Sequence, residues 1–271
     1  MTLSQQKSDA RDARDERDER DERDERDERD ERDERDERVV IITGAARGLG
    51  AAIAQTLAAD GMCIVAVDRD AAGVESTAQR LNDSGARVMA LPADITDESS
   101  VARTVDGAFT AFGRIDVLIN NAAIDITLPI EELEIRDWNR VVATNLSAPF
   151  MLTRAALPQL RQHGGHVVNI ASTASRRAWP NAAAYHATKW GLLGLSHALH
   201  AELRPQGVKV TAIVAGGMRT PFLLDRFPDI DPTVLQDPAN VARAVRFALS
   251  QPAETVIPEM MVLPMRETSW P

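Results

Sequence analysis

Val39-Val40-Ile41-Ile42-Thr43-Gly44-Ala45-Ala46-Arg47-Gly48-Leu49-Gly50 begins as an apolar run and ends as a glycine-rich turn. Four consecutive apolar residues are typical of a strand that is buried on both faces of a parallel sheet. A helical pattern follows through about residue 60, so the glycines lie between a predicted strand and a predicted helix. In that setting small residues let the backbone turn tightly and approach a pyrophosphate, while the helix N-terminus supplies N–H donors. The alternative is a tight turn that binds nothing.

Alternating strand and helix patterns continue from this turn to the end of the chain. Further apolar runs predict strands at residues 62–67, 87–91, 115–119, 166–170, 207–214 and 260–265. Helical patterns between them predict helices near residues 71–84, 97–112, 131–162, 182–204 and 239–250. This alternation predicts an α/β fold, a three-layer doubly wound parallel sheet of the Rossmann type with helices on both faces. A ligand is expected beyond the carboxyl ends of the strands, where the winding reverses.

The first 38 residues have a different composition. Residues 14–37 are eight copies of Arg-Asp-Glu, with no apolar residue to bury. Residues three apart always carry like charges, and the attractive pairs four apart are offset by a repulsive one, which disfavours a stable helix. We therefore expect residues 1–38 to form a disordered, solvated tail, with a binding arm as the alternative. Residues 39–271 are expected to form a single domain.

The net charge of −10 lies mainly in this tail. Residues 11–38 hold 10 Arg and 17 acidic residues, and Lys7 and Asp9 cancel, which leaves 20 basic and 23 acidic residues in 39–271. The body of the chain is therefore nearly balanced in charge. It shows no basic stripe of the kind that nucleic-acid binding requires.

Composition also bears on the cellular setting. Hydrophobic residues make up 44% of the chain, yet no run approaches the roughly 18 apolar residues of a membrane span. The first ten residues, MTLSQQKSDA, lack the apolar core of a secretory signal. The single cysteine, Cys63, cannot form an internal disulfide. We expect a cytoplasmic protein with no membrane or nucleic-acid partner.

The stretch Tyr185-His186-Ala187-Thr188-Lys189 places a phenol and an ammonium on one face of a helix. A free tyrosine keeps its proton at neutral pH because its pKa is roughly 10. A positive charge one helical turn away lowers that pKa, so the phenol could exchange a proton with a substrate oxygen. The alternative is a solvated helix face that carries a stray tyrosine. Tyr185 is the only tyrosine of the chain.

Asp68 ends the second predicted strand, about 20 residues beyond the glycines. A carboxylate in that position can accept hydrogen bonds from a ribose 2′-hydroxyl and would repel a 2′-phosphate. The position therefore favours NAD as cofactor. NADP remains open, because Arg69 and Arg47 could each approach a phosphate.

These motifs stand in a particular order along the chain. Thr43-Gly-x-x-x-Gly48-x-Gly50, Asn120-Asn121-Ala122-Ala123, Asn145, Ser172 and Tyr185-x-x-x-Lys189 follow one another, and Ser172 stands 13 positions before Tyr185. Through these motifs and their order, the chain resembles the short-chain dehydrogenase/reductase family over residues 39–271. The glycine spacing is that of the compact single-domain branch of the family. The resemblance implies an NAD(P)-binding Rossmann-fold domain.

The resemblance also implies roles for four residues. Tyr185 would be the acid/base, and Lys189 would lower its pKa and bind the nicotinamide ribose. Ser172 would hydrogen-bond the substrate oxygen, and Asn145 would hold a water that links Lys189 to solvent. Besides Tyr185 and Lys189, the cofactor would contact Gly44, Arg47, Gly48, Leu49, Gly50, Asp68, Arg69, Asp94, Ile95, Asn121, Ala122, Ala123, Met218 and Thr220.

The expected function is hydride transfer between NAD(P)(H) and a small-molecule secondary alcohol or carbonyl compound. The alternative is a non-catalytic NAD(P)-sensing regulatory protein on the same fold. The resemblance further implies a homotetramer or homodimer built on the helices near residues 131–162 and 182–204, with Leu192, Leu193 and Leu195 as apolar surface.

Two positions depart from the usual pattern of this family. Ala123 stands where the family usually has glycine, and Ala215-Gly216-Gly217 replaces a Pro-Gly pair. Without the proline we expect a looser loop after the sixth strand. The segment Val256-Ile-Pro-Glu-Met-Met-Val-Leu-Pro also lacks the ending common in acyl-carrier ketoreductases, which disfavours that substrate class.

Two further groups of residues have side chains that can bind ligands. Arg176, Arg177 and Trp179 follow Ser172 and are expected to rim the substrate mouth, where they could attract an anion; a solvated loop is the alternative. His197 and His200 are three residues apart on a helix, but no carboxylate or cysteine pattern accompanies them. We therefore expect no metal site.

Overall fold

The computed structural model describes residues 38–267. The predicted tail therefore lies outside the described residues, except for Arg38 at its end. The Arg38 carbonyl accepts a hydrogen bond from the Cys63 N–H, so the folded body begins one residue earlier than expected. Among the helices of residues 38–267, none is long and apolar enough to cross a membrane.

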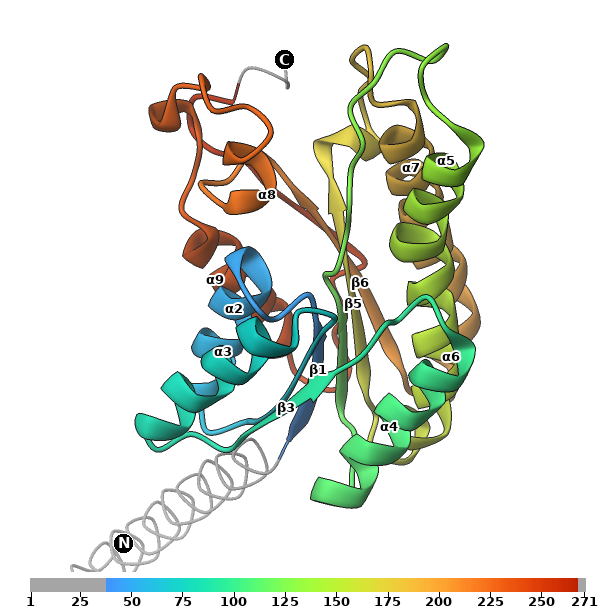
Figure 1. Cartoon of the computed structure of the whole chain (residues 1–271). Coiled ribbons are helices and arrows are strands. Elements are labelled where there is room, and N and C mark those ends of the chain that lie inside the picture. The colour runs from blue at the N-terminus through green and yellow to red at the C-terminus, as the bar shows by residue number, and fades with distance from the viewer. Residues whose placement is uncertain (1–37, 268–271) are drawn as a thin grey trace, which may run out of the picture. The chain divides into compact units, whose positions relative to one another are not determined.

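A seven-stranded parallel sheet forms the centre of the domain (Figure 1). Its order is β3-β2-β1-β4-β5-β6-β7, and every neighbouring pair is parallel. The strands are β1 (Val39–Thr43), β2 (Cys63–Asp68), β3 (Val88–Pro92), β4 (Val117–Asn120), β5 (His166–Ser172), β6 (Lys209–Ala215) and β7 (Glu259–Val262). The winding reverses between β1 and β4, which confirms the predicted doubly wound topology and its switch point.

Helices cover both faces of this sheet (Figure 1). One face carries α2 (Gly48–Ala58), α3 (Ala71–Asp83) and α9 (Pro238–Leu249). The other carries α4 (Glu98–Phe112), α5 (Ile135–Val142), α6 (Ala148–Gln162) and α7 (Ala183–Leu203). Alternate residues of β1 supply the two apolar layers: Val40 and Ile42 pack under the first set, and Val39 and Ile41 under the second. All four are fully or almost fully buried, which explains the continuous apolar run.

The element boundaries differ from the expected ones in a few places. The helical region expected at 131–162 is divided by a π-helical turn, η1 (Ala143–Ser147), between α5 and α6. β5 and β6 run further than predicted, to Ser172 and Ala215. A short helix, α8 (Pro221–Leu224), lies between the strand predicted at residues 207–214 and the helix predicted near residues 239–250, where no element was predicted. These local adjustments leave the predicted order of elements unchanged.

The proposed apolar surface on α7 is wrong for two of its three residues. Leu192 and Leu193 are 1% and 4% exposed, because they face the body of their own domain. Large exposed aromatic side chains on α6 and α7 are instead Phe150 and Trp190, at 49% and 51%.

Candidate active site

The glycine turn after β1 has a backbone that requires glycine. Gly44 and Gly48 have positive φ angles of 68° and 60°, a region that residues with side chains rarely adopt. A Cβ atom at Gly50 would lie 2.0 Å from the Gly44 carbonyl oxygen. The first turn of α2 is thus packed directly on the glycine turn, with no room for a side chain between them.

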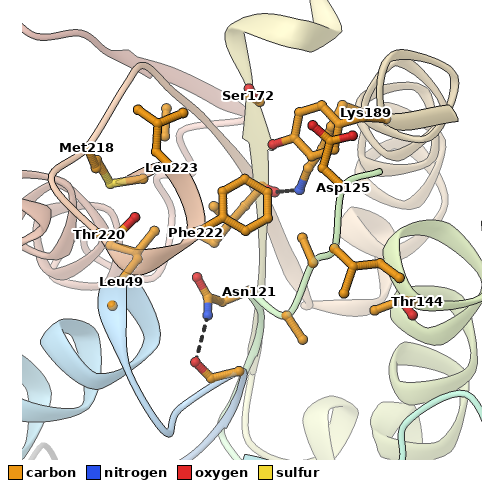
Figure 2. A pocket seen from close by; sticks show the side chains of 18 of the residues that line it. Leu49, Asn121, Asp125, Thr144, Ser172, Lys189, Met218, Thr220, Phe222 and Leu223 are labelled. Carbon is orange, nitrogen blue, oxygen red and sulfur yellow. Dashed lines mark hydrogen bonds between the residues drawn. The ribbon is translucent and has the colours of Figure 1, made fainter. Parts of the chain in front are cut away.

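Asn121 holds the glycine turn against the end of β4. Its amide Nδ2 donates to the carbonyl oxygens of Thr43 and Gly44, at 2.8 and 3.2 Å. The Thr43 hydroxyl in turn accepts hydrogen bonds from the N–H groups of Asn121 and Ala122, at 3.0 and 3.1 Å. These bonds join the ends of β1 and β4 at the switch point, and Figure 2 shows Asn121 with a hydrogen bond from its amide.

Asp68 stands at the end of β2, beside the same turn. Its carboxylate accepts one hydrogen bond from the Ala46 N–H and one from the Asp70 N–H, each at 3.1 Å. The side chain is therefore fixed next to the glycine turn. Arg47 points to Asp225 at 3.7 Å, and both side chains of this pair are largely exposed. Such an exposed pair contributes little stability, so Arg47 can be redirected at low cost.

Asp94, the next acidic candidate, follows β3. Its carboxylate accepts hydrogen bonds from the N–H and the hydroxyl of Thr96, at 2.9 and 2.7 Å. These bonds lower the pKa of Asp94 below its ordinary value. The charged side chain is thus held in the loop, beside the buried Ile95, and both residues line the cavity described below.

A cavity of about 670 Å³ extends along the carboxyl ends of the strands. That volume lies within the usual range for small-molecule sites. Among the predicted residues, the lining includes Gly44, Arg47, Gly48, Leu49, Asp68, Arg69, Asp94, Ile95, Asn121, Ala122, Ala123, Ser172, Tyr185, Lys189, Met218 and Thr220. The two predicted residues outside the lining are Gly50, packed beneath the turn, and Asn145.

Tyr185 and Lys189 lie at the far end of this cavity from Asp68, on the first turns of α7. Both side chains are buried, with 8% and 3% exposure. The Lys189 ammonium donates to the Ile170 carbonyl at 2.7 Å and lies 5.6 Å from the centre of the Tyr185 ring. Ser172, at the end of β5, faces the same space (Figure 2).

The expected lowering of the Tyr185 pKa by Lys189 is not what the structure gives. Burial raises the pKa of Tyr185 to about 12, an effect that the Ser172 hydroxyl opposes and the charge of Asp125 reinforces. Burial also lowers the pKa of Lys189 to about 8, against the opposing charge of Asp125. Desolvation is the largest cause of both shifts, because both groups lie inside the protein.

Asn145 lies in the π-helical turn and holds backbone together. Its side chain accepts a hydrogen bond from the Ile124 N–H and donates to the Ile124 carbonyl, both at 2.8 Å. It also donates to the Thr188 hydroxyl at 3.1 Å. Asn145 therefore joins the loop after β4 to α7, and its water-holding role stays a prediction.

The loop after β6 is braced although it lacks the family's proline. The N–H groups of Gly216 and Gly217 donate to the Val262 carbonyl and to the Glu267 carboxylate, at 2.9 and 3.0 Å. Gln236 adds a bond from its own N–H to the Gly217 carbonyl and one from its side chain to Val262. The C-terminal segment therefore supplies hydrogen bonds that hold this loop, and the greater mobility expected without the proline stays a prediction.

Several lining residues were missed by sequence reasoning. Asp125 and Arg226 form an ion pair at 2.7 Å, and the Arg226 guanidinium lies 4.5 Å from the centre of the Phe222 ring. Phe222 itself lies 5.9 Å from the Tyr185 ring. The one available signal was the position of Asp125, directly after Asn121-Ala122-Ala123-Ile124. The stretch that holds Phe222 and Arg226 has no helical or strand periodicity.

The loop after β5 contributes Trp179 but not the arginines. Trp179 lines the cavity. The His186 imidazole fixes this part of the loop, because its Nε2 accepts a hydrogen bond from the backbone N–H of Trp179 at 3.1 Å and its Nδ1 bonds the Ala174 carbonyl at 3.0 Å. Arg176 instead pairs with Glu259 of β7, and Arg177 does not line the cavity either. The arginine rim was therefore a wrong prediction. Within residues 38–267, no group of three or more His, Cys, Asp or Glu side chains could hold a metal ion.

Comparison with known proteins places this site in a family. The family model described as short chain dehydrogenase matches residues 38–231. D-threitol dehydrogenase from Mycolicibacterium smegmatis is 40% identical over 177 residues, which are 65% of this chain and 68% of that enzyme.

Two solved structures have the same fold over nearly their whole length. One is a 3-ketoacyl-(acyl-carrier-protein) reductase from Brucella melitensis complexed with NADH, with a TM-score of 0.77 and 32% identity over 84% of this chain and 98% of that one. The other is an alcohol dehydrogenase from Thermococcus sibiricus complexed with 5-hydroxy-NADP, with a TM-score of 0.79 and 28% identity over 85% of this chain and 97% of that one. This chain therefore belongs to the short-chain dehydrogenase/reductase family.

Proposed function

We propose that this protein is an NAD(P)-dependent oxidoreductase that interconverts a secondary alcohol and a carbonyl compound. The observation that carries the proposal is the single cavity that Asp68 and the glycine turn line at one end, and Ser172, Tyr185 and Lys189 at the other. The alcohol dehydrogenases among its relatives support the same reaction type.

The residues at the first end of the cavity fit a dinucleotide. Gly48 begins α2, whose first N–H groups have no acceptor inside the helix, and the helix dipole at this end favours a pyrophosphate. The fixed carboxylate of Asp68 would accept hydrogen bonds from a ribose 2′-hydroxyl and would repel a 2′-phosphate. We therefore propose NAD as the preferred cofactor. Arg69 and Arg47 act in the opposite direction, because their positive charges would attract the 2′-phosphate of NADP. The nicotinamide, when bound, supplies the hydride acceptor or donor.

The protein's own part in the reaction is the movement of a proton. Tyr185 Oη would exchange a proton with the substrate oxygen, and the Ser172 hydroxyl would stabilise charge that develops on that oxygen. Because the pKa of Tyr185 is raised to about 12, the protonated phenol is the resting form. That form suits proton donation to an alkoxide during carbonyl reduction. In alcohol oxidation the phenol must first lose its proton, which higher pH favours.

The decisive test of this function is a turnover screen. The purified protein is incubated with secondary alcohols, hydroxy acids, steroids and sugars in the presence of NAD or NADP, and the absorbance of the reduced cofactor is followed. Sustained formation of NADH or NADPH supports the proposal. Binding of NADH without turnover of any compound would instead favour a dinucleotide sensor, which has no need of Ser172, Tyr185 and Lys189 together.

We also propose a homo-oligomer, either a dimer or a tetramer. The support is membership of the family together with Phe150 and Trp190, whose large side chains are half exposed on α6 and α7. Packing these helices against their copies would remove both side chains from water. Multi-angle light scattering should give a mass of at least twice 29.6 kDa at micromolar concentration. A single species at the monomer mass would contradict the proposal.

A further inference from the structure

Three large aromatic side chains that line the cavity are also open to solvent. Trp179, Phe222 and Phe227, here called the aromatic wall, are 37%, 37% and 39% exposed. The Phe222 ring lies 5.9 Å from the Tyr185 ring, and Figure 2 shows Phe222 in front of the space beside Lys189. The aromatic wall therefore adjoins the proposed acid/base. Exposed apolar surface of this kind, gathered in a cavity, is typical of a site that an apolar ligand covers.

Trp179 is fixed from behind by a buried histidine. His186 is only 8% exposed, and its ring lies edge-on to the Trp179 ring with the centres 4.3 Å apart. Its Nε2 accepts from the backbone N–H of Trp179, so its Nδ1 carries the hydrogen that is donated to the Ala174 carbonyl. Both ring nitrogens are thus used to hold the loop after β5. This part of the aromatic wall is in place before any ligand binds.

The two phenylalanines are held by one arginine. The Arg226 guanidinium lies 4.5 Å from the centre of Phe222 and 5.3 Å from that of Phe227, distances at which a cation attracts an aromatic ring. Arg226 is itself anchored by the buried Asp125, at 2.7 Å. The aromatic wall is therefore preorganised on both of its segments. A preorganised surface loses less conformational freedom when a ligand covers it.

The cations that line the cavity away from the glycine turn already have partners. Arg226 pairs with Asp125, and Arg140 pairs with Asp137 at 3.2 Å. Lys189 is 3% exposed and donates to a backbone carbonyl. A substrate carboxylate would have to compete with these partners for a positive charge, so the cavity is poorly suited to an anion.

Glu267 disfavours an anionic substrate further. Its carboxylate lines the cavity and accepts a hydrogen bond from the Gly217 N–H at 3.0 Å. The negative charge of Glu267 would repel a substrate carboxylate, while Arg226 at the aromatic wall would repel a substrate ammonium. An uncharged substrate avoids both costs.

We propose that the substrate is an uncharged cyclic secondary alcohol or ketone whose ring system carries an apolar group that covers the aromatic wall. This inference rests on the proposed function and narrows it to a substrate class. During oxidation the reacting carbon gives a hydride to the oxidised dinucleotide, the hydroxyl proton passes to Tyr185 in its ionised form, and the carbonyl forms. The apolar group is unchanged and only binds and orients the substrate.

The first test varies the apolar group alone. It compares trans-4-phenylcyclohexanol with cyclohexanol, each with NAD and with NADP. Burial of the added phenyl ring predicts that kcat/KM for the larger alcohol exceeds that for cyclohexanol by at least about 10-fold. Equal values, or a preference for cyclohexanol, would overturn this inference and leave the oxidoreductase standing. Failure of both compounds and of the whole alcohol screen would overturn the proposed function itself, and this inference with it.

The second test varies the charge at constant ring size. It compares trans-4-methylcyclohexanol with trans-4-hydroxycyclohexanecarboxylate and trans-4-aminocyclohexanol. Because a charged group loses hydration in the cavity without gaining a partner, kcat/KM for the methyl compound should exceed both others by at least about 10-fold. A carboxylate or amine that is used as well as the methyl compound would contradict an uncharged substrate.

Variants of the aromatic wall then assign the preference to its side chains. Trp179→Ala and Phe227→Ala should each lower the ratio of kcat/KM for trans-4-phenylcyclohexanol to that for cyclohexanol by at least about 3-fold, since each removes part of the covered surface. Phe109→Ala is the matched control: Phe109 is 41% exposed on α4 and does not line the cavity, so the ratio should stay at the wild-type value.

The variants can also refute the proposal. Folding is verified by thermal melting and by NADH fluorescence. Folded Trp179→Ala and Phe227→Ala proteins that both keep the wild-type ratio would show that the aromatic wall does not bind the substrate. Trp179→Phe, which restores an aromatic ring, should recover part of the ratio lost in Trp179→Ala. If an alanine variant does not fold, the comparison of the two alcohols with the wild type still decides.

Discussion

The carboxylate of Asp68 accepts a hydrogen bond from the N–H of Ala46 at 3.1 Å, which joins the end of β2 to the glycine turn after β1. Asp68 also lines the cavity. The Asp68 side chain thus stabilises the turn that would bind the pyrophosphate. It also carries the negative charge that would discriminate between NAD and NADP. This double role makes Asp68 the place to test the first prediction.

Asp68 should set the cofactor preference. A charge-assisted hydrogen bond to the 2′-hydroxyl is worth about 1.5–3 kcal/mol, which corresponds to roughly a 10- to 100-fold preference for NAD in kcat/KM. Asp68→Ala should weaken NAD and let Arg69 and Arg47 engage the 2′-phosphate, so the ratio should move toward NADP. The measurement is kcat/KM with each cofactor for both proteins. A wild type that prefers NADP would show that the arginines govern this end of the cavity.

Gly50→Ala should damage the domain at its glycine turn. The added Cβ would meet the Gly44 carbonyl oxygen at 2.0 Å, and backbone cannot move aside as a flexible side chain can. We expect the free energy of unfolding to fall by about 3 kcal/mol or more, the upper end of the range for overpacking. Chemical denaturation of the variant and the wild type measures this difference.

The matched control for this substitution is Gly194→Ala in α7. Nothing lies within 4 Å of a Cβ at Gly194, and alanine in an exposed helix is favoured over glycine by about 0.5–1 kcal/mol. Gly194→Ala should therefore leave stability unchanged or raise it slightly. A Gly50→Ala protein as stable as the control would mean that the turn is wrongly placed.

His166 should make the domain less stable in mild acid. Burial, Lys209 and Arg38 lower its pKa from 6.5 to about 3. Its Nε2 bonds the Thr211 hydroxyl at 2.7 Å, and that hydroxyl donates its own hydrogen to the Ile257 carbonyl, so Nε2 is the donor. Between pH 6.5 and pH 3 the unfolded chain binds a proton that the folded chain does not, so stability falls as pH falls.

The expected slope from this residue is about 1.4 kcal/mol per pH unit below pH 6.5. His166→Gln keeps a donor for Thr211 but cannot titrate. The wild type should therefore lose stability more steeply than His166→Gln between pH 6 and pH 4, as measured by urea denaturation. Above pH 7.5, where the histidine is neutral in both states, the two slopes should coincide. Parallel curves throughout would contradict the buried neutral histidine.

Local patterns predicted the fold and much of the site. The apolar run of β1 and the following glycines could be read directly, because strand burial and backbone turns depend on neighbouring residues. Tyr185 and Lys189 could be placed on one helix face by their spacing. Asp68 could be placed because a strand end fixes where its side chain emerges.

The rest of the site depends on contacts between distant residues. Asp125 meets Arg226, 101 positions further on, only through the path of the irregular chain around α8. The ion-pair partner of Arg176, Glu259, likewise comes from a distant part of the chain, strand β7. The pKa of Tyr185 could not be read from its spacing to Lys189, because it is set by how deeply the tertiary structure buries both groups. The spacing of two residues along a helix does not determine how deeply other elements bury them.

The most direct test of the account is Tyr185→Phe, assayed with an alcohol that the wild type oxidises. Phenylalanine preserves the ring that packs against Phe222 and removes only the hydroxyl that would exchange a proton. Binding of NADH, followed by fluorescence, and the thermal midpoint should match the wild type, while kcat should fall by at least about 100-fold. A substrate deuterated at the reacting carbon establishes that chemistry limits the rate. An unchanged kcat under that condition would contradict Tyr185 as the acid/base.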